Sequence, residues 1–279
     1  MTITALTNFI TSFDTLVKHQ YQAGMKLRDK VRIKSGVVGS SHKFPKLNKG
    51  IAQPRLPQTE VTTMGVQHAV ATATLTDWSA ADYSDVYDLQ KLSFDEQREL
   101  VNTAVMAMGR RLDQLIIDAM SLSANSTQVS TDVGGSGTGM KLDKILRTAR
   151  LMDDAGVPRE GRVMVTSARA IEQALLETNI TSSDYNVYMP LLTGQLKQYG
   201  SFEFVFIETR DEGGLPLASN IRNNFAFHKD AVGLAVGIDI RTEVNYIPDK
   251  TSTLVNALFS AGAVTIDTDG VYDVLTTES

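Results

Sequence analysis

The chain has 279 residues, of which 42% are hydrophobic and 21% charged, and it contains no cysteine. Its 20 glycines and 7 prolines are about a tenth of the chain, far below the roughly 25–30% typical of low-complexity disorder. The composition excludes a disulfide framework, a thiolate metal site and a cysteine nucleophile, and it leaves enough apolar residues for a sizeable core.

The net charge of −5 hides an uneven distribution along the chain. Residues 1–56 carry ten lysines and arginines against two aspartates, a balance of +8, whereas the remaining residues have a balance of −13. A basic segment on an acidic body favours either nucleic-acid binding or contact with the acidic surface of another copy. The regular aromatic interleaving of a single-strand binder is missing, which favours self-association.

The first part of the chain predicts a helix followed by extended structure. Residues 7–27 place apolar side chains at helical spacing and indicate a short amphipathic helix. Residues 59–75 show two-sided alternation of small side chains, which predicts a strand ribbon. The apolar stretch at 9–17 is too polar for a signal peptide, and no run of about 18 apolar residues occurs. We therefore expect a soluble protein, intracellular when made, with no membrane partner.

The segment 31–84 has strand character and turn residues but few large apolar side chains. A two-stranded ribbon is marginally stable in water by itself, and a structureless loop of this length is unusual inside a compact domain. The segment is therefore either disordered or ordered by lying on another molecule, and its β-rich, non-repetitive composition favours the second. Trp78 is interpreted as a packing anchor where the ribbon joins the body.

A long helix is predicted next. Ser93 and Glu96 have the spacing of a capping box, in which each side chain satisfies an unpaired backbone amide. Apolar residues then recur every three or four positions as far as Met120. Nearly 30 helical residues would form a rod about 40–45 Å long.

The rest of the chain mixes helices and strands. A glycine-rich connector at 134–139 precedes a helix from Leu142 that stops at Gly156, and Ser167 is a helix N-cap after a short strand. Asp269-Gly270 is predicted to be a hairpin turn. Strands are expected at 162–166, 202–207, 225–227, 232–236, 238–244, 254–266 and 271–275. Because there is no regular βαβ alternation, the predicted class is α+β.

The patterns that would indicate catalysis are incomplete. Gly134 and Gly139 have the spacing of a phosphate-binding loop, but Met140 replaces the required lysine and Leu142 the Ser/Thr that would hold magnesium. The four histidines lack metal-ligand spacing, and the aspartates at 267–273 lack the glutamate of a calcium loop. We predict no enzyme activity, no catalytic residue, no cofactor and no metal site. A nucleotide-binding enzyme built on the 134–141 loop is the least favoured alternative.

Several stretches carry a family resemblance. They are Asp-Tyr-Ser-Asp-Val-Tyr-Asp at 82–88, Arg-Val-Met-Val-Thr-Ser-Ala at 162–168, the segment 226–235 and the segment 259–267. In this order, with the basic arm, ribbon and long helix, they resemble the major capsid protein of tailed double-stranded-DNA bacteriophages. The resemblance covers nearly the whole chain and implies the Hong Kong 97-type fold.

The resemblance also implies a domain division and a function. Residues 1–35 would be the N-arm and 36–84 the E-loop that overlaps a neighbour. The peripheral (P) domain would take 85–149 with its spine helix, the axial (A) domain 150–228, and strands at 229–279 would complete the P domain. Hexamers and pentamers would close an icosahedral phage head around double-stranded DNA.

The expected partners follow from the same resemblance. They are other copies of the chain, a separate scaffolding protein, a portal protein, non-specifically contacted DNA and a decoration protein. The expected location is the virion, after assembly in the bacterial host cytoplasm. The inter-subunit candidates are Arg28, Lys30, Arg32, Lys34, Lys43, Lys46, Lys49 and Arg55. An encapsulin-type compartment shell is the alternative that the 7–27 helix leaves open, although the basic, Gly/Pro-broken ribbon favours the phage protein.

Overall fold

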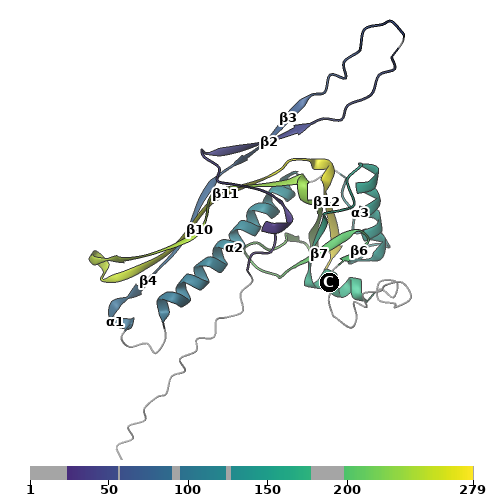
Figure 1. The fold of residues 1–279 in the computed structure, drawn as a ribbon. Helices are drawn as coiled ribbons and strands as arrows, with labels where there is room; N and C mark the ends of the chain where they lie inside the picture. Colours follow the sequence, from purple (N-terminus) through teal and green to yellow (C-terminus); the bar gives the residue numbers. More distant parts are fainter. Residues whose placement is uncertain (1–23, 56, 90–94, 124–126, 177–197, 279) are drawn as a thin grey trace, which may run out of the picture.

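The computed structural model describes residues 24–55, 57–89, 95–123, 127–176 and 198–278, which form two sheets and a separate hairpin (Figure 1). The α-helices of these residues are α1 (Val86–Leu89), α2 (Glu96–Ser123), α3 (Leu142–Asp154) and α4 (Ala168–Leu175). The short 3₁₀ helices are η1 (Arg28–Lys30), η2 (Lys229–Ala231), η3 (Pro248–Lys250) and η4 (Thr268–Gly270).

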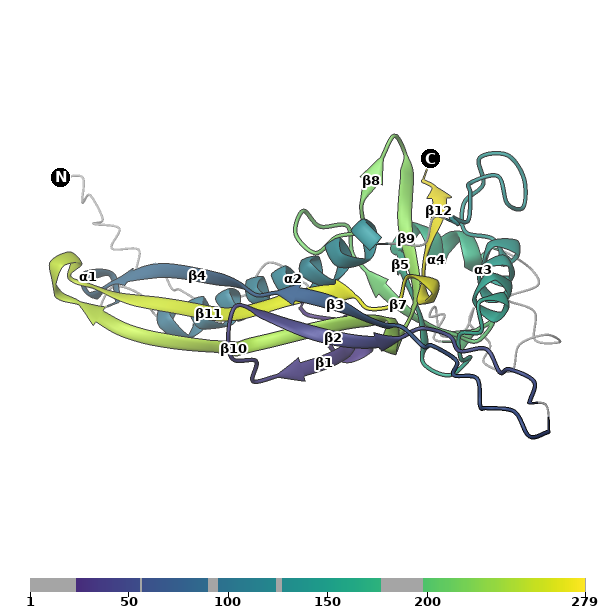
Figure 2. The ribbon, with the colours of Figure 1, turned by 90° about the horizontal axis from the view of Figure 1, so that it is seen from above.

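The first sheet is long and four-stranded, in the order β1-β10-β11-β4. Its strands are β1 (Arg32–Ser35), β4 (Thr76–Asp85), β10 (Val232–Ile247) and β11 (Ser252–Thr265). β1 runs parallel to β10, and the other pairings are antiparallel. Helix α2 lies along one face of this sheet (Figures 1 and 2), and buried Leu112 and Ile116 of α2 belong to the same core as Phe259 of β11.

The second sheet stands at one end of the first and has the order β12-β9-β5-β7-β6, with β8 paired to β9. Its strands are β5 (Arg162–Ser167), β6 (Gln198–Tyr199), β7 (Phe202–Ile207), β8 (Leu217–Ala218), β9 (Ile221–His228) and β12 (Val271–Thr277). Strand β5 is buried on both faces. Val163 and Val165 join the core shared with α2, whereas Met164 packs in a second core with Ile145 of α3 and Ala170 of α4. The two sheets are therefore joined by a continuous apolar core.

The projecting hairpin consists of β2 (Ser41–Leu47), β3 (His68–Thr74) and the connection between them. The two strands pair antiparallel, and Figure 1 shows the connection extending far from both sheets. The extended ribbon predicted around 59–75 therefore exists, but its strand starts at His68.

Strand pairing crosses the expected domain boundaries at several places. Strand β4, which lies within the expected E-loop 36–84, pairs with β11 of the first sheet. Strand β1, which lies within the expected arm 1–35, pairs with β10 of that sheet. Of the strands in the expected segment 229–279, β10 and β11 belong to the first sheet, whereas β12 pairs with β9 of the second. Helix α3 crosses the predicted boundary at 149/150 and packs on the second sheet.

Two local predictions are wrong. Helix α2 starts at Glu96, and its first turn is capped by Asp95, whose Oδ1 accepts a hydrogen bond of 3.3 Å from the Arg98 amide. Glu96 instead accepts a hydrogen bond of 2.6 Å from Ser84 of β4, and Ser93 lies outside the described residues. Asp269-Gly270 lies in η4, which connects strands of different sheets and is no hairpin turn.

Other local predictions are confirmed. Strand β7 covers 202–207, α3 ends just before Gly156, and Ser167 caps α4 by accepting a 3.1 Å hydrogen bond from the Ala170 amide. Trp78 packs partly buried against the main core, beneath the Arg111 guanidinium at 3.7 Å from its ring centre. The predicted helix at 7–27 lies almost entirely outside the described residues. Along the part of the chain described, no helix combines the length and apolarity needed to cross a membrane.

Asp273 of β12 has a buried carboxyl group that is incompletely paired. Its Oδ2 accepts a hydrogen bond of 3.3 Å from Gln128 Nε2, and its Oδ1 has no partner among the described residues. Burial raises the pKa of this carboxyl group to about 6, and the hydrogen bond from Gln128 opposes the rise only in part. Between roughly pH 4 and 6 the folded protein therefore holds a proton that the unfolded chain has lost, and stability from this group falls as the pH rises.

Asp273→Asn is expected to raise the free energy of unfolding at pH 7.5 by on the order of 1–2 kcal/mol, because the variant buries no charge. The gain stays below the full effect of the pKa shift because the new amide NH₂ also needs a partner. At pH 4.5 the difference should shrink to roughly a third. Urea unfolding at both pH values measures it, and an equal gain at both would contradict the role of the charge.

Candidate assembly interface

The base of the projecting hairpin rests on the first sheet, on the face opposite α2. Phe44 of β2 is only 2% exposed and packs with Ala73 of β3 against Ala235 of β10. The base is closed by a hydrogen bond of 2.9 Å from the Leu75 amide to the Ser40 carbonyl oxygen. The hairpin base is thus a third layer over the sheet, anchored by a single aromatic side chain.

Three glycines of the sheet make room for this layer. A β-carbon at Gly233 would lie 2.8 Å from the Phe44 ring, and one at Gly237 would lie 2.7 Å from the Leu75 side chain. A β-carbon at Gly262 would lie 2.0 Å from the Thr74 carbonyl oxygen. These three positions form the glycine seat, where the sheet admits the hairpin backbone and side chains only because no side chain occupies it.

Beyond the glycine seat the hairpin exposes apolar side chains. Ile51, Val61 and Met64 in the connection between β2 and β3 are 74%, 75% and 60% exposed. Leu47 and Val70 at the ends of the strands are also exposed. A projecting element with apolar groups and no core of its own marks an interaction surface.

Four of the eight predicted inter-subunit residues have acidic partners in their own chain. Arg28 donates two hydrogen bonds, of 2.9 and 2.6 Å, to the Asp239 carboxylate. These bonds raise the pKa of Arg28 and, with the positive charge of Arg28, lower that of Asp239. Lys30 pairs with Glu203 of β7.

The other two of these four are in the hairpin. Lys46 pairs with Asp267, and Lys49 with Asp269. The structure therefore pairs Arg28, Lys30, Lys46 and Lys49 with acidic side chains of their own subunit, and the intermolecular contacts expected for them stay a prediction.

The other four candidates are Arg32, Lys34, Lys43 and Arg55, and they form no ion pair with any residue that the structure describes. Lys34 lies on edge strand β1, which pairs only with β10 in its sheet, and Lys43 lies on β2. These four cations stay candidates for contact with a neighbouring copy.

The glycine-rich segment at 134–139 folds onto the protein itself. Gly139 lies against Gln173 of α4, whose Oε1 accepts a hydrogen bond of 2.8 Å from the Met140 amide. The Thr138 carbonyl oxygen accepts a bond of 2.6 Å from Lys144 Nζ. These contacts suit a structural connector between α2 and α3. Within the described ranges, no three His, Asp or Glu side chains are grouped in a way that could hold a metal ion.

The sequence analysis did not predict the glycine seat, although the sequence contains a pattern that could have indicated it. Glycine inside a strand often marks a close approach of another backbone, and Gly233, Gly237 and Gly262 all fall in predicted strands or directly between them. Since their partner is more than 150 residues earlier in the chain, the pattern could indicate an approach but could not identify what approaches.

Comparison with solved structures shows which known proteins share this fold. A chain in the capsid structure of the cyanophage P-SCSP1u is 15% identical, with a TM-score of 0.78 over 98% of this chain and 94% of that one. A chain of Mycobacterium phage Che8 is 17% identical, with a TM-score of 0.72 over 97% and 98%. A chain in the head structure of Helicobacter pylori bacteriophage KHP40 is 10% identical, with a TM-score of 0.76 over 99% and 97%. Among curated proteins no match was found.

A long sheet backed by one helix, a second sheet and a projecting hairpin define a shell-forming subunit with the Hong Kong 97-type fold, so the predicted α+β class and fold are confirmed. A family model described as phage capsid protein matches residues 5–278. The chain belongs to the phage capsid protein family. It is a major capsid protein, which assembles with other copies of itself into the phage head.

Proposed function

We propose that the projecting hairpin is the principal contact between neighbouring copies in hexamers and pentamers, which close the icosahedral head around double-stranded DNA. The exposed apolar side chains of Ile51, Val61 and Met64 carry this proposal, because the subunit itself does not cover them. Each copy lays its hairpin on a neighbour, and burial of these side chains there stabilises the shell.

We propose a domain division that the strand pairing supports. We assign residues 36–75 to the E-loop, with the projecting hairpin as its ordered part. The first sheet with α2 is the P domain, and the second sheet with α3 and α4 is the A domain. Strand β12 belongs to the A domain because it pairs with β9.

The remaining partners are proposed from charge and from family membership. The acidic balance after residue 56 keeps contact with packaged DNA weak, because like charges repel. Arg32, Lys34, Lys43 and Arg55 contact acidic side chains of neighbouring copies. A scaffolding protein, a portal protein and a decoration protein complete the assembly, which takes place in the host cytoplasm. The role of the chain is structural and not catalytic.

The proposal is tested by a triple variant, Ile51→Ser with Val61→Ser and Met64→Ser, compared with the wild type by electron microscopy and sedimentation. We expect the variant to fold normally and to form few or no closed shells, because three exposed apolar contacts per copy are lost. The matched control replaces the nearby polar residues Gln53, Thr62 and Thr63 by serine and should assemble. Normal shells from the apolar variant would overturn the proposal.

A further inference from the structure

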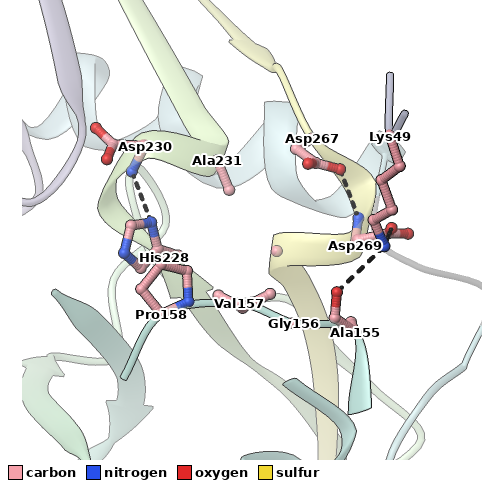
Figure 3. A pocket seen from close by; sticks show the side chains of 11 residues that line it. Lys49, Ala155, Gly156, Val157, Pro158, His228, Asp230, Ala231, Asp267 and Asp269 are labelled. Atoms are coloured by element: carbon pink, nitrogen blue, oxygen red, sulfur yellow. Dashed lines mark hydrogen bonds and ion pairs between the residues drawn. The ribbon is translucent and has the colours of Figure 1, made fainter. Parts of the chain in front are cut away.

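Two lysines of the projecting hairpin reach across to the connection between the two sheets. Lys46 Nζ lies 2.8 Å from Asp267 Oδ1, and Lys49 Nζ lies 3.5 Å from Asp269 Oδ2. Lys49 Nζ also donates a hydrogen bond of 3.2 Å to the Ala155 carbonyl oxygen at the end of α3 (Figure 3). Ion pairs therefore connect the hairpin to the segment between β11 of the first sheet and β12 of the second, which is called the junction below.

This junction has defined local structure. Asp267 caps η4 by accepting a hydrogen bond of 3.1 Å from the Asp269 amide, which orients the Asp267 carboxylate. Below them, a cavity of about 280 Å³ is lined by residues 155–158, His228 and Asp230 (Figure 3). Lys49 lines one side of this cavity, beside Asp269 and Ala155.

The glycine seat fixes the hairpin base but not the direction of the rest of the hairpin. Phe44 is the last fully buried residue on β2, and β2 ends at Leu47, which is exposed. In its described residues, 48–55 and 57–67, the connection contains no strand. Lys46 and Lys49 lie just beyond the glycine seat, where a small change of angle displaces the far end of the projecting part by a large distance.

We propose that Lys46 and Lys49, paired with Asp267 and Asp269, form a salt-sensitive latch that holds the projecting hairpin at one angle to the body of the subunit. A hairpin held in one direction before assembly meets a neighbour pre-organised, which reduces the ordering cost of association. The inference concerns the single subunit and goes beyond the proposed contact between copies.

The latch is reversible because its ion pairs are at least partly exposed; in the Lys46–Asp267 pair the side chains are 30% and 42% exposed. The side chain of Lys49 is 80% exposed and that of Asp269 is 47% exposed. Exposed pairs of this kind are weak and are screened by salt, over about 10 Å at 0.1 M and about 3 Å at 1 M ionic strength. Rising ionic strength therefore releases the hairpin while the apolar glycine seat stays intact.

The experiment measures the hairpin angle in the full-length, unassembled subunit. Because the chain contains no cysteine, spin labels on Gln53→Cys and Arg147→Cys report one distance, from the hairpin connection to α3. We expect a narrow distance distribution in low salt, and a distribution at least twice as broad in 1 M salt and in the Lys46→Gln/Lys49→Gln variant. The matched control is Lys43→Gln on the same strand, which should leave the distribution narrow.

A charge exchange separates the latch from a general loosening of the hairpin. Lys49→Glu should broaden the distribution, and Lys49→Glu combined with Asp269→Lys should narrow it again. Distributions that are the same in wild type, Lys46→Gln/Lys49→Gln and high salt would overturn the latch, as would equal broadening by Lys43→Gln. This result is independent of the contact between copies, because shell formation is scored separately with the Ile51/Val61/Met64 variant.

Discussion

Replacing Gly262 by alanine is expected to unseat the projecting hairpin. The new β-carbon would lie 2.0 Å from the Thr74 carbonyl oxygen, a separation that forces the hairpin backbone or β11 to move. Overpacking of this kind costs about 1–3 kcal/mol. If there were no clash, replacing glycine by alanine would stabilise the protein by about 0.4–1 kcal/mol, because alanine reduces the conformational entropy of the unfolded chain. A loss of stability therefore indicates the clash, and a gain indicates its absence.

The measurement combines urea unfolding with hydrogen exchange of the backbone amides of β2 and β3. We expect a loss of stability and a loss of amide protection confined mainly to the hairpin, whereas α2 and the second sheet stay protected. Gly24→Ala is the matched control, because a β-carbon there meets no atom within 4 Å and the backbone is not left-handed. A Gly262→Ala variant with an unchanged hairpin would show that Gly262 is not needed for seating it.

Local features of the fold could be predicted from the sequence because they depend on neighbours in the chain. The capping of α4 by Ser167 needs only the next turn of helix, and the end of α3 needs only Gly156, which has a φ of +79°. The apolar run at 162–166 predicts a buried strand whatever its partners are. The predicted positions of these elements lie close to the observed ones.

Features that depend on distant partners could not be predicted in the same way. Nothing local distinguishes β4 from the hairpin strand β3, since only Leu75 separates them, yet β4 pairs with β11 and β3 pairs with β2. The turn residues Asp269-Gly270 resemble a hairpin turn, but β12 finds a better partner in β9. For the candidate interface, the sequence indicated a basic segment and did not show which of its lysines and arginines pair within the subunit.

Asp113 is the clearest case of a residue whose role emerges only from the structure. It is a fully buried acid on the long helix α2, directly after Leu112, and nothing in the apolar pattern of the sequence indicated its burial. Its carboxylate accepts hydrogen bonds of 3.0 Å from the amides of Lys26 and Leu27, and one of 2.9 Å from Arg210 Nη2. It thereby joins the segment before β1 and the loop after β7 to the spine of the subunit.

Asp113→Ala is expected to lower the free energy of unfolding by about 3–5 kcal/mol, because it leaves the Arg210 guanidinium and two backbone amides without their partner in a buried place. Asp113→Asn should cost less, since its remaining carbonyl oxygen still accepts from the amides. Asp118→Ala on the same helix is the matched control, because that exposed carboxylate bonds only to Gln114 among the described residues, and its loss should change stability by at most about 0.5 kcal/mol.

Urea unfolding of the unassembled subunit measures these differences, and hydrogen exchange of the Leu27 amide locates them. We expect Leu27 to lose protection in Asp113→Ala and to keep it in Asp118→Ala. Leu27 and Val31 are buried in the main core beside α2 and lie just before β1. If they left the core, β1 would lose its anchor and the edge of the first sheet would become less stable. Equal stabilities of the Asp113→Ala and Asp118→Ala variants would mean that apolar packing alone holds this segment against the helix.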